Sequence, residues 1–284
     1  MTSQAQKLRD LINSGQHFVA AEAYSALTGR IVESVGFKAA YLGGHACSAF
    51  HYAVPDNGVF SQIEQLDQAT RIADAMTIPL IADADTLGET VADAFHFTRK
   101  YVRSGIAGFH IEDEVNPKHS KFAGGLISIS DMQFRIDAAV RARGDHPFVI
   151  IARCDEMYAE EKGGGGTSSM EEAIKRGLAY AEAGADVITF ASGPPDKQAE
   201  LAKHMTVPVC VLGFDLPGTA FTLSTGWGWT GAAQLHLARA KELMETGKIT
   251  VDSYVLEGKD QLIEQDVYDA LTLDWVEKTG RRAR

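Results

Sequence analysis

Acidic residues follow two short apolar runs in the first half of the chain. Asp83 and Asp85 come directly after residues 78–82, and Glu112 closes residues 105–112 about one strand–helix unit later. Because alternate residues of a strand point to the same side, Asp83 and Asp85 are expected to share a face. Three carboxylates at the ends of neighbouring parallel strands would repel one another unless a cation lay between them. Oxygen ligands favour a hard divalent ion, so the pattern predicts Mg2+, with Mn2+ as the alternative, at Asp83, Asp85 and Glu112.

A purely structural explanation of these acids is also open. Asp85 would then cap the helix that follows it, and Asp113 would close a turn. This explanation accounts for single residues better than for three carboxylates together.

Other polar residues stand at the ends of neighbouring apolar runs. Arg153 ends one of them. A second run ends in an aromatic hydroxyl, two glycines and an imidazole, which are Tyr41, Gly43, Gly44 and His45. A guanidinium can hold a carboxylate through paired hydrogen bonds, and glycines let a ligand approach backbone N–H groups. With a metal, this set suits a small substrate that carries a carboxylate beside a carbonyl or hydroxyl, whose enolate the metal would stabilise. The alternative for Arg153 is a structural ion pair.

Runs typical of strands alternate with runs of helical spacing along the whole chain. The predicted strands are residues 17–23, 39–44, 78–82, 105–112, 148–153, 186–191, 207–212 and 220–224. The predicted helices after the opening one are residues 25–35, 61–76, 89–104, 131–143, 169–183, 198–204, 231–246 and 265–278, with no helix between the last two strands. The alternation favours right-handed βαβ units and a closed (β/α)8 barrel, whose ligand site lies at the carboxyl ends of the strands. A flavodoxin-like open sheet is the competing architecture.

Length and composition limit the range of functions. The 284 residues, 45% of them hydrophobic, suffice for one large core, and no linker or repeat divides them. We therefore predict a single barrel domain over residues 1–284, with residues 250–284 as a C-terminal helical extension. A net charge of -11 argues against a nucleic acid or an anionic membrane as the partner.

Targeting signals and disulfides are not expected. No run of 18 apolar residues could span a membrane, and residues 1–11 resemble an amphipathic helix rather than a signal peptide. Cys47, Cys154 and Cys210 are few, odd in number and widely spaced, which favours a reducing cytoplasm.

Several short motifs, taken in order and spacing, resemble the isocitrate lyase / phosphoenolpyruvate mutase superfamily. They are Tyr41-Leu42-Gly43-Gly44, Pro55-Asp56, Asp83-Ala84-Asp85-Thr86, His110-Ile111-Glu112-Asp113, Asn116-Pro117-Lys118 and Arg153-Cys154-Asp155. The match runs from about residue 5 to residue 212.

The resemblance implies a (β/α)8 barrel whose final helix is exchanged with a neighbouring subunit, giving homodimers or homotetramers. It implies Mg2+ held mainly by Asp85, with Asp83 and Glu112 reaching it directly or through water. It also implies 2-oxo or 2-hydroxy acid substrates, whose C–C or P–C bonds break or move beside an enolpyruvate-like intermediate. Asp56 and the backbone of Gly43 and Gly44 would help to bind the substrate carboxylate.

The chain departs from the lyase pattern at several positions. Lyase members carry a lid cysteine that serves as the acid, and Ser120 stands in its place, where a hydroxyl is a poor proton donor. Ala191 and residues 212–215 replace the polar anchors of lyases that act on larger acids, and Gly43 replaces a serine. We therefore expect a substrate that is smaller or less polar than isocitrate.

The lid and the barrel mouth hold further candidates. Lys118 is expected to close over an anionic substrate, and His119 or Lys121 could replace the missing acid. Four aromatic side chains lie near the predicted mouth, where packing is the simpler explanation: His45, His51, Tyr52 and His110. Trp227 and Trp229 could cover the pocket or serve subunit packing.

The leading hypothesis is an Mg2+-dependent carbon–carbon lyase or decarboxylase of a small 2-oxo or 2-hydroxy acid. Arg153, Lys118, Asp56 and Glu112 are expected to act in catalysis. The first alternative is a phosphonate P–C mutase or hydrolase, and the second is a barrel that binds a ligand without turnover. A Schiff-base aldolase is disfavoured because no predicted strand ends in lysine.

Overall fold

The computed structural model describes residues 2–120, 122, 124–158, 164–213, 216, 218–249, 256 and 258–280. The chain divides into two compact units, Met1–Ala232 and Ala233–Arg284, and each is described here by itself. The assignment of one domain with an extension from residue 250 remains a prediction.

The first unit is a closed barrel of eight parallel strands in chain order. The strands are β1 (Phe18–Glu22), β2 (Ala39–Leu42), β3 (Leu80–Asp83), β4 (Gly108–Glu112), β5 (Val149–Cys154), β6 (Val187–Phe190), β7 (Val209–Leu212) and β8 (Phe221–Leu223). Pairing of Phe18 in β1 with Phe221 in β8 closes the sheet. The predicted (β/α)8 barrel is thus confirmed, and the open-sheet alternative was wrong.

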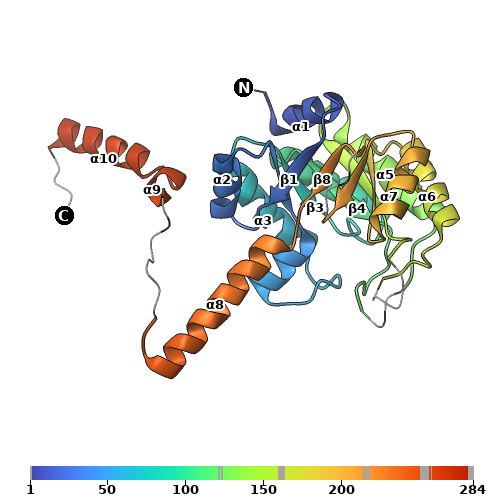
Figure 1. The fold of residues 1–284 in the computed structure, drawn as a ribbon. Helices are drawn as coiled ribbons and strands as arrows, with labels where there is room; N and C mark the ends of the chain where they lie inside the picture. The colour runs from blue at the N-terminus through green and yellow to red at the C-terminus, as the bar shows by residue number, and fades with distance from the viewer. Residues whose placement is uncertain are drawn as a thin grey trace. The chain divides into compact units, whose positions relative to one another are not determined.

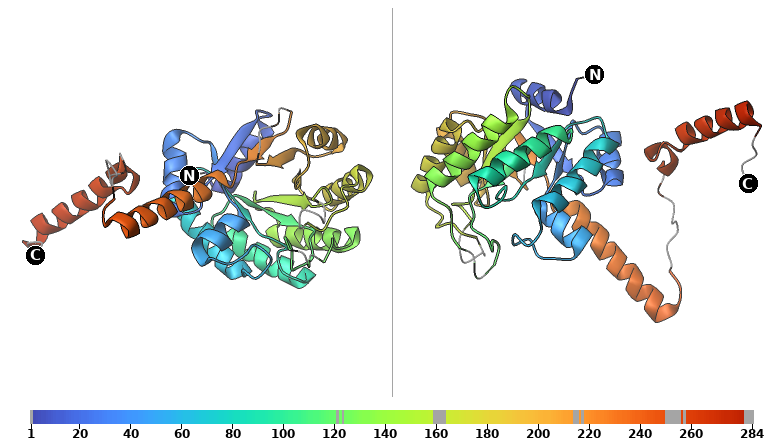
Figure 2. Two further views of the ribbon diagram at one scale, coloured as in Figure 1. Left: turned by 60° about the horizontal axis from the view of Figure 1, so that its bottom comes forward. Right: turned by 180° about the vertical axis from the view of Figure 1, so that it is seen from behind.

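Helices surround these strands, as Figures 1 and 2 show. They are α1 (Gln4–Asn13), α2 (Ala26–Val35), α3 (Gln62–Ala75), α4 (Val91–Arg103), α5 (Ile129–Arg143), α6 (Met170–Glu182) and α7 (Pro195–His204). Local sequence sets where they begin. Ser61 with Glu64 and Thr90 with Asp93 form reciprocal capping boxes, which satisfy the unpaired N–H groups of the first turn.

Two connections between strands differ from a regular helix. A π-helix, η1 (Ala46–Tyr52), follows the end of β2 after three intervening residues, where the sequence predicted only a glycine-rich strand end. Between β7 and β8 the described residues 213, 216 and 218–220 form no helix, as expected. Phe214 and Asp215, named in the sequence analysis, lie outside the described residues.

The core has two layers. Inward-facing side chains such as Tyr41, Ile81 and Phe221 fill the barrel, and a larger cluster lies between strands and helices. Cys154 belongs to this outer cluster, as its alternation with Arg153 predicted. All three cysteines are free and buried.

Helix α8 (Trp227–Thr246) begins four residues earlier than predicted and leads into the second unit, which also holds α9 (Lys259–Leu262) and α10 (Gln265–Thr279). Neither α8 nor α10 contains a buried residue. Large apolar side chains are exposed on both, Leu237 by 56% and Leu271 by 63%. Exposed apolar surface of this kind is typical of interaction sites.

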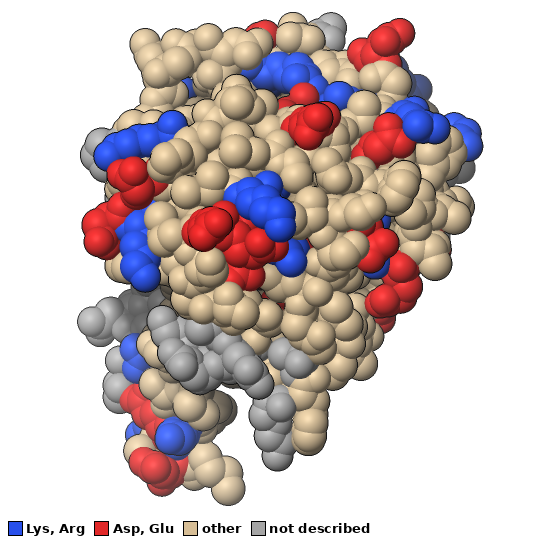
Figure 3. Space-filling view, turned by 90° about the vertical axis from the view of Figure 1, so that its right-hand side faces the viewer, with Lys and Arg blue, Asp and Glu red and all other residues tan. Residues whose placement is uncertain are grey.

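Acidic and basic side chains are interspersed on the face of the molecule that Figure 3 shows. Neither sign of charge dominates that face. Among the described residues, no helix is both long and apolar enough to cross a membrane.

Candidate active site

Three buried carboxylates meet at the carboxyl ends of β3 and β4. Asp83 ends β3, Glu112 ends β4, and with Asp85 they place carboxylate oxygens within 4.8 Å of one another. Asp85 reaches this position through a turn, because its φ of 47° lies in the left-handed region and its N–H donates to Oδ1 of Asp83 at 2.8 Å. The predicted grouping is therefore present, although strand alternation does not explain Asp85.

Asp83 is fixed from two sides. Its Oδ2 accepts a 3.0 Å hydrogen bond from the N–H of Gly44, and its Oδ1 lies 3.5 Å from Nδ1 of His110. Nε2 of His110 is in turn hydrogen-bonded to the hydroxyl of Tyr41 at 2.8 Å. The Gly44 N–H, expected to be free for substrate, is thus engaged by a candidate metal ligand.

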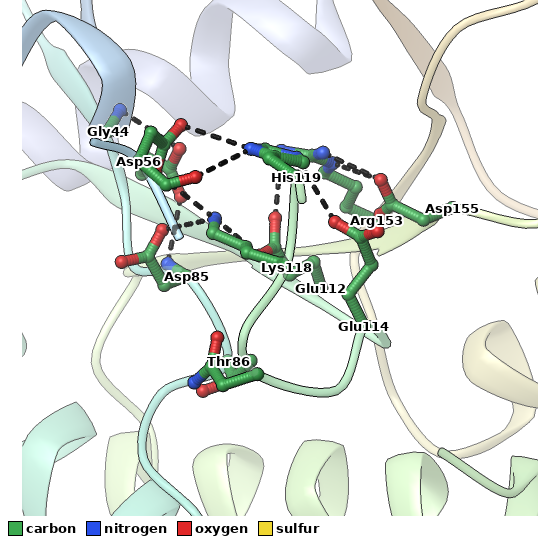
Figure 4. A network of polar contacts seen from close by, with 12 residues as sticks. Gly44, Asp56, Asp85, Thr86, Glu112, Glu114, Lys118, His119, Arg153 and Asp155 are labelled. Atoms are coloured by element: carbon green, nitrogen blue, oxygen red, sulfur yellow. Dashed lines mark hydrogen bonds and ion pairs between the residues drawn. The ribbon is translucent and has the colours of Figure 1, made fainter. Parts of the chain in front are cut away.

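Lys118 lies among the carboxylates. Its Nζ is 2.6 Å from Oδ1 of Asp85, 2.5 Å from Oε1 of Glu112 and 3.6 Å from Oδ1 of Asp56, and the side chain has no exposed surface (Figure 4). Burial disfavours the charged ammonium, but the surrounding acids outweigh it and hold the pKa of Lys118 well above its usual value. Burial is also the main reason that the pKa of Asp85 rises to about 7, against the opposing charge of Lys118.

Arg153 ion-pairs with two acids on the other side of the site. It contacts Oε2 of Glu112 at 2.8 Å and Oδ1 of Asp155 at 2.6 Å. Burial opposes its charge, yet Asp155 and Glu112 keep the pKa of Arg153 well above its usual value. The guanidinium is thus a permanent cation with defined orientation.

His119 bridges two further acids (Figure 4). Its Nε2 lies 3.1 Å from Oε2 of Glu114, and its Nδ1 lies 3.0 Å from the carbonyl oxygen and 3.4 Å from Oδ2 of Asp56. Although burial opposes it, hydrogen bonding to Asp56 and Glu114 raises the pKa of His119 to about 10. Since both nitrogens face acceptors, the ring is an imidazolium at neutral pH.

A cavity of about 560 Å³ opens above these groups. Its lining includes these residues named from the sequence: Tyr41, Gly43, Gly44, His45, Asp56, Asp83, His119, Arg153, Ala191 and Leu212. Three site residues are buried and do not line this cavity: Asp85, Glu112 and Lys118.

Sequence reasoning missed four lining residues. They are Pro55, Tyr158, Ser192 and Thr225. Each belongs to a connection rather than to a strand or helix. Pro55 stood within a motif of the family resemblance, and Thr225 opens the segment that holds Trp227 and Trp229. No periodic signal marks Tyr158 or Ser192.

Three aromatic candidates near the mouth do not line the cavity. Nε2 of His51 contacts the carbonyl oxygen of Tyr24, and His110 is fully buried. Tyr52 packs on Phe60 with ring centroids 4.9 Å apart. His51, Tyr52 and His110 therefore serve packing and hydrogen bonding within the protein, which was the simpler explanation from the sequence.

The tryptophans and the lid serine have structural contacts. Trp227 is 56% exposed, and Trp229 packs on His45 with ring centroids 5.0 Å apart. Ser120 donates its hydroxyl to the carbonyl of Pro117 at 3.2 Å. Lys121, the other acid candidate, lies outside the described residues.

The donor set at Asp83, Asp85 and Glu112 fits a hard divalent cation, because it consists of clustered oxygens with little access to water. Glu114, His119 and Asp155 form a second cluster of the same spread. That cluster fits a metal less well, because each ring nitrogen of His119 faces an acceptor and so holds a proton instead of a free lone pair.

Comparison of the sequence with models of known protein families identifies the family to which this chain belongs. The family model for phosphoenolpyruvate phosphomutase matches residues 8–226. The chain belongs to the PEP mutase/isocitrate lyase superfamily. The resemblance noted from the sequence motifs is thereby confirmed.

Three relatives within the superfamily have different named activities. The chain is 35% identical to 2,3-dimethylmalate lyase of Eubacterium barkeri, over 72% of this chain and 68% of the relative. It is 32% identical to oxaloacetate decarboxylase of Pseudomonas putida (strain GB-1), over 74% and 70%. It is 36% identical to phosphonopyruvate hydrolase of Variovorax sp. (strain Pal2), over 66% of this chain and 63% of that protein. The relatives thus include two enzymes that cleave C–C bonds and one that acts on a phosphonate. The prediction that the protein is an enzyme is confirmed.

Solved structures of the superfamily share the whole fold. Oxaloacetate acetylhydrolase with 3,3-difluorooxalacetate has a TM-score of 0.84 at 24% identity, over 99% of both chains, which shows the fold alone. Phosphonopyruvate hydrolase in complex with oxalate and Mg2+ has a TM-score of 0.82 at 26% identity, over 98% of this chain and 99% of that one. A divalent metal with a small dicarboxylate therefore occurs on this fold.

Proposed function

We propose that this superfamily member is an Mg2+-dependent lyase or decarboxylase that cleaves a C–C bond of a small 2-oxo or 2-hydroxy acid. The observation that carries the proposal is the gathering of Asp83, Asp85 and Glu112 within 4.8 Å, beneath a cavity lined by Arg153. Oxygen ligands of this kind hold Mg2+, and the bound ion would supply the Lewis acidity that stabilises an enolate.

The remaining groups bind and orient the substrate. The Arg153 guanidinium, held by Glu112 and Asp155, presents fixed positive charge to a substrate carboxylate. Tyr41 lines the cavity, and its hydroxyl is oriented by a hydrogen bond with His110. Because these groups are fixed by packing and hydrogen bonds, the substrate meets a preorganised site.

Two apolar residues of the cavity lining limit the groups that the substrate can carry. Ala191 and Leu212 line the cavity, where lyases of larger acids place polar anchors. These apolar side chains suit short alkyl substituents and offer no partner to a third carboxylate such as that of isocitrate. We therefore propose oxaloacetate or a malate with small alkyl substituents as the substrate class.

His119 is the proposed proton donor for the carbon that is released. When C3–C4 of oxaloacetate or C2–C3 of a malate breaks, the electron pair stays on C3, and C3 must then take up a proton. For a malate, the proton of the C2 hydroxyl passes to a carboxylate of the site such as Asp56, which lines the cavity, as the carbonyl of the 2-oxo product forms. The His119 imidazolium lines the cavity and is protonated at neutral pH, and we propose that it gives up a proton that it otherwise shares with Asp56 or Glu114. Ser120 is a weaker candidate, because a neutral hydroxyl is a much weaker acid than an imidazolium.

Self-association is a further part of the proposal. No residue of α8 or α10 is buried, and both helices expose large apolar side chains. Burial of these side chains against a second copy would remove them from water, as exchange of the final helix predicts. Light scattering is expected to give the mass of a homodimer or homotetramer, and a monomer at micromolar concentration would contradict it.

A substrate panel tests the proposed reaction. Purified protein with Mg2+ is expected to release a 2-oxo acid product from oxaloacetate or from an alkyl-substituted malate, and EDTA is expected to abolish turnover. Loss of activity across the panel with metal supplied would overturn the proposal. Binding of oxalate without turnover of any compound would favour the non-catalytic alternative.

Phosphonate chemistry remains a second candidate function. It is favoured by 36% identity to phosphonopyruvate hydrolase and by Ser120 in place of the lid cysteine, which this chemistry does not require. Turnover of phosphonopyruvate, followed by phosphorus NMR, separates the two reactions.

A further inference from the structure

The turn after β3, residues 85–89, carries Asp85 in an uncommon backbone conformation. Asp85 has a φ of 47°, and Leu87 and Gly88 follow with φ of 57° and 94°. Residues other than glycine rarely adopt positive φ, and they keep it only where surrounding contacts hold the chain. The direction of the Asp85 carboxylate therefore depends on what holds this turn.

One side chain from a distant part of the sequence holds the turn. Arg135, on α5, donates from Nη1 to the carbonyl oxygens of Thr86 and Gly88, at 3.0 Å each, and from Nη2 to that of Glu89 at 3.0 Å. Arg135 is only 7% exposed, and it lies outside the lining of the cavity above the carboxylates. A single planar guanidinium thus fixes three carbonyl groups of one turn.

Contacts within the barrel hold the backbone of Asp85, but the residues after it border open space. The Asp85 carbonyl oxygen accepts a 2.9 Å hydrogen bond from the N–H of Glu112, and its N–H donates to Asp83. A second cavity, of about 140 Å³, is lined in part by Asp85 and Thr86. Since close packing does not fix the turn on that side, loss of Arg135 would let the turn relax into the cavity.

We propose that Arg135 is a positioning residue, which sets the direction of the Asp85 carboxylate toward the metal by fixing the turn that follows it. The inference rests on the metal site of the proposed function. All three of the hydrogen bonds go to backbone oxygens, so the guanidinium acts on the carboxylate through the chain. A lysine would replace it only in part, because an ammonium is a point donor and lacks the planar fork.

Mn2+ binding by matched variants tests the positioning. Calorimetry compares the wild type with Arg135→Met, Arg135→Lys and, as a control, Arg9→Met. Arg9 also donates to backbone carbonyls, those of Pro147 at 2.7 Å and Phe148 at 3.0 Å, but at the amino ends of the strands. Mn2+ affinity is expected to fall by about tenfold in Arg135→Met, as is typical of changes next to a metal ligand, and by less in Arg135→Lys. Arg9→Met is expected to lose stability in urea and to keep the wild-type affinity.

A second pair of variants tests the same link from the turn itself, in case Arg135→Met does not fold. A Cβ at Gly88 would lie 2.4 Å from Cβ of Asp93, so Gly88→Ala forces the turn to shift. Gly105, which precedes β4, has a similar φ of 86° and open space where a Cβ would lie. Gly88→Ala is expected to weaken Mn2+ binding, whereas Gly105→Ala carries only the backbone strain and is expected to match the wild type.

The outcomes separate this inference from the proposed function. Wild-type affinity in folded Arg135→Met, or in Gly88→Ala, overturns the positioning role and leaves the metal site standing. Equal losses of affinity in Arg135→Met and Arg9→Met would show a general loss of structure, and would overturn the positioning role as well. If the wild type itself binds no Mn2+, the metal site fails and the positioning of its ligand fails with it.

Discussion

The N–H of Gly228, in the first turn of α8, donates a 2.6 Å hydrogen bond to Oε2 of Glu22, the last residue of β1. Oε1 of Glu22 accepts from the hydroxyl of Thr225 at 2.9 Å and from the N–H of Gly226 at 2.6 Å. One buried carboxylate thus satisfies the backbone groups that open a helix and complements its dipole. It explains why α8 begins at Trp227, and it holds Thr225 at the cavity wall.

Glu22→Gln is expected to lower the free energy of unfolding by about 1–3 kcal/mol, because the new amide places N–H groups against the N–H donors that the carboxylate accepted. Urea unfolding measures the change. Asp67→Ala, which removes an exposed ion pair with Arg71, is the control and is expected to change stability by less than about 0.5 kcal/mol. An equally small effect of Glu22→Gln would show that the carboxylate does not anchor α8.

Gly44→Ala is expected to weaken metal binding. A Cβ at this position would lie 2.8 Å from Oδ2 and 3.3 Å from Cγ of Asp83, so the carboxylate would have to move. We expect Mn2+ affinity, measured by calorimetry, to fall by about tenfold, since second-shell changes typically cost 10–100-fold. Gly231→Ala has open space around the new Cβ and serves as the control. Unaltered affinity in Gly44→Ala would show that Asp83 does not take part in binding the metal.

The ion pairs of His119 predict a pH dependence of stability. Its pKa is raised from 6.5 to about 10, against burial, by Asp56 and Glu114. A raised pKa contributes stability that is fully present below about pH 6.5 and is lost as the pH rises toward 10. The difference in unfolding free energy between wild type and His119→Gln is therefore expected to shrink from pH 6 to pH 10. His96→Gln, at an exposed position of α4, is the control, and a difference that grows with pH would contradict the assignment.

The three cysteines are expected to be inert in the folded protein. All are buried, and burial raises the pKa of Cys210 to about 12 and those of Cys47 and Cys154 above their usual value. Because the thiolate is the reactive form, a disulfide reagent at pH 8 should label none of the three in the native state and all of them after unfolding. Rapid labelling of any cysteine in native protein would contradict the buried positions.

Much of the barrel and part of its site could be predicted from the sequence. Strand order follows chain order in this fold, so Asp83 and Glu112, at the ends of consecutive apolar runs, had to be neighbours. Glu22 carries the same signal, an acid that closes an apolar strand, and that signal could have identified it.

The rest depended on the paths of connections. Asp85 is placed by a left-handed turn, and Lys118 by the course of residues 114–120, neither of which has a sequence period. Tyr158 and Thr225 reach the cavity from the connections after β5 and β8. The sequence predicted a lysine that reaches over the substrate, whereas the structure buries Lys118 among carboxylates, a difference that only tertiary contacts decide.

The most direct test of the central claim is anomalous diffraction from crystals soaked with Mn2+ and oxalate, for the wild type and for Asp85→Asn. The account predicts one strong peak between the carboxylates of Asp83, Asp85 and Glu112, with oxalate beside Arg153, and a weak or absent peak in the variant. A peak elsewhere, or no peak in the wild type at saturating Mn2+, would contradict it.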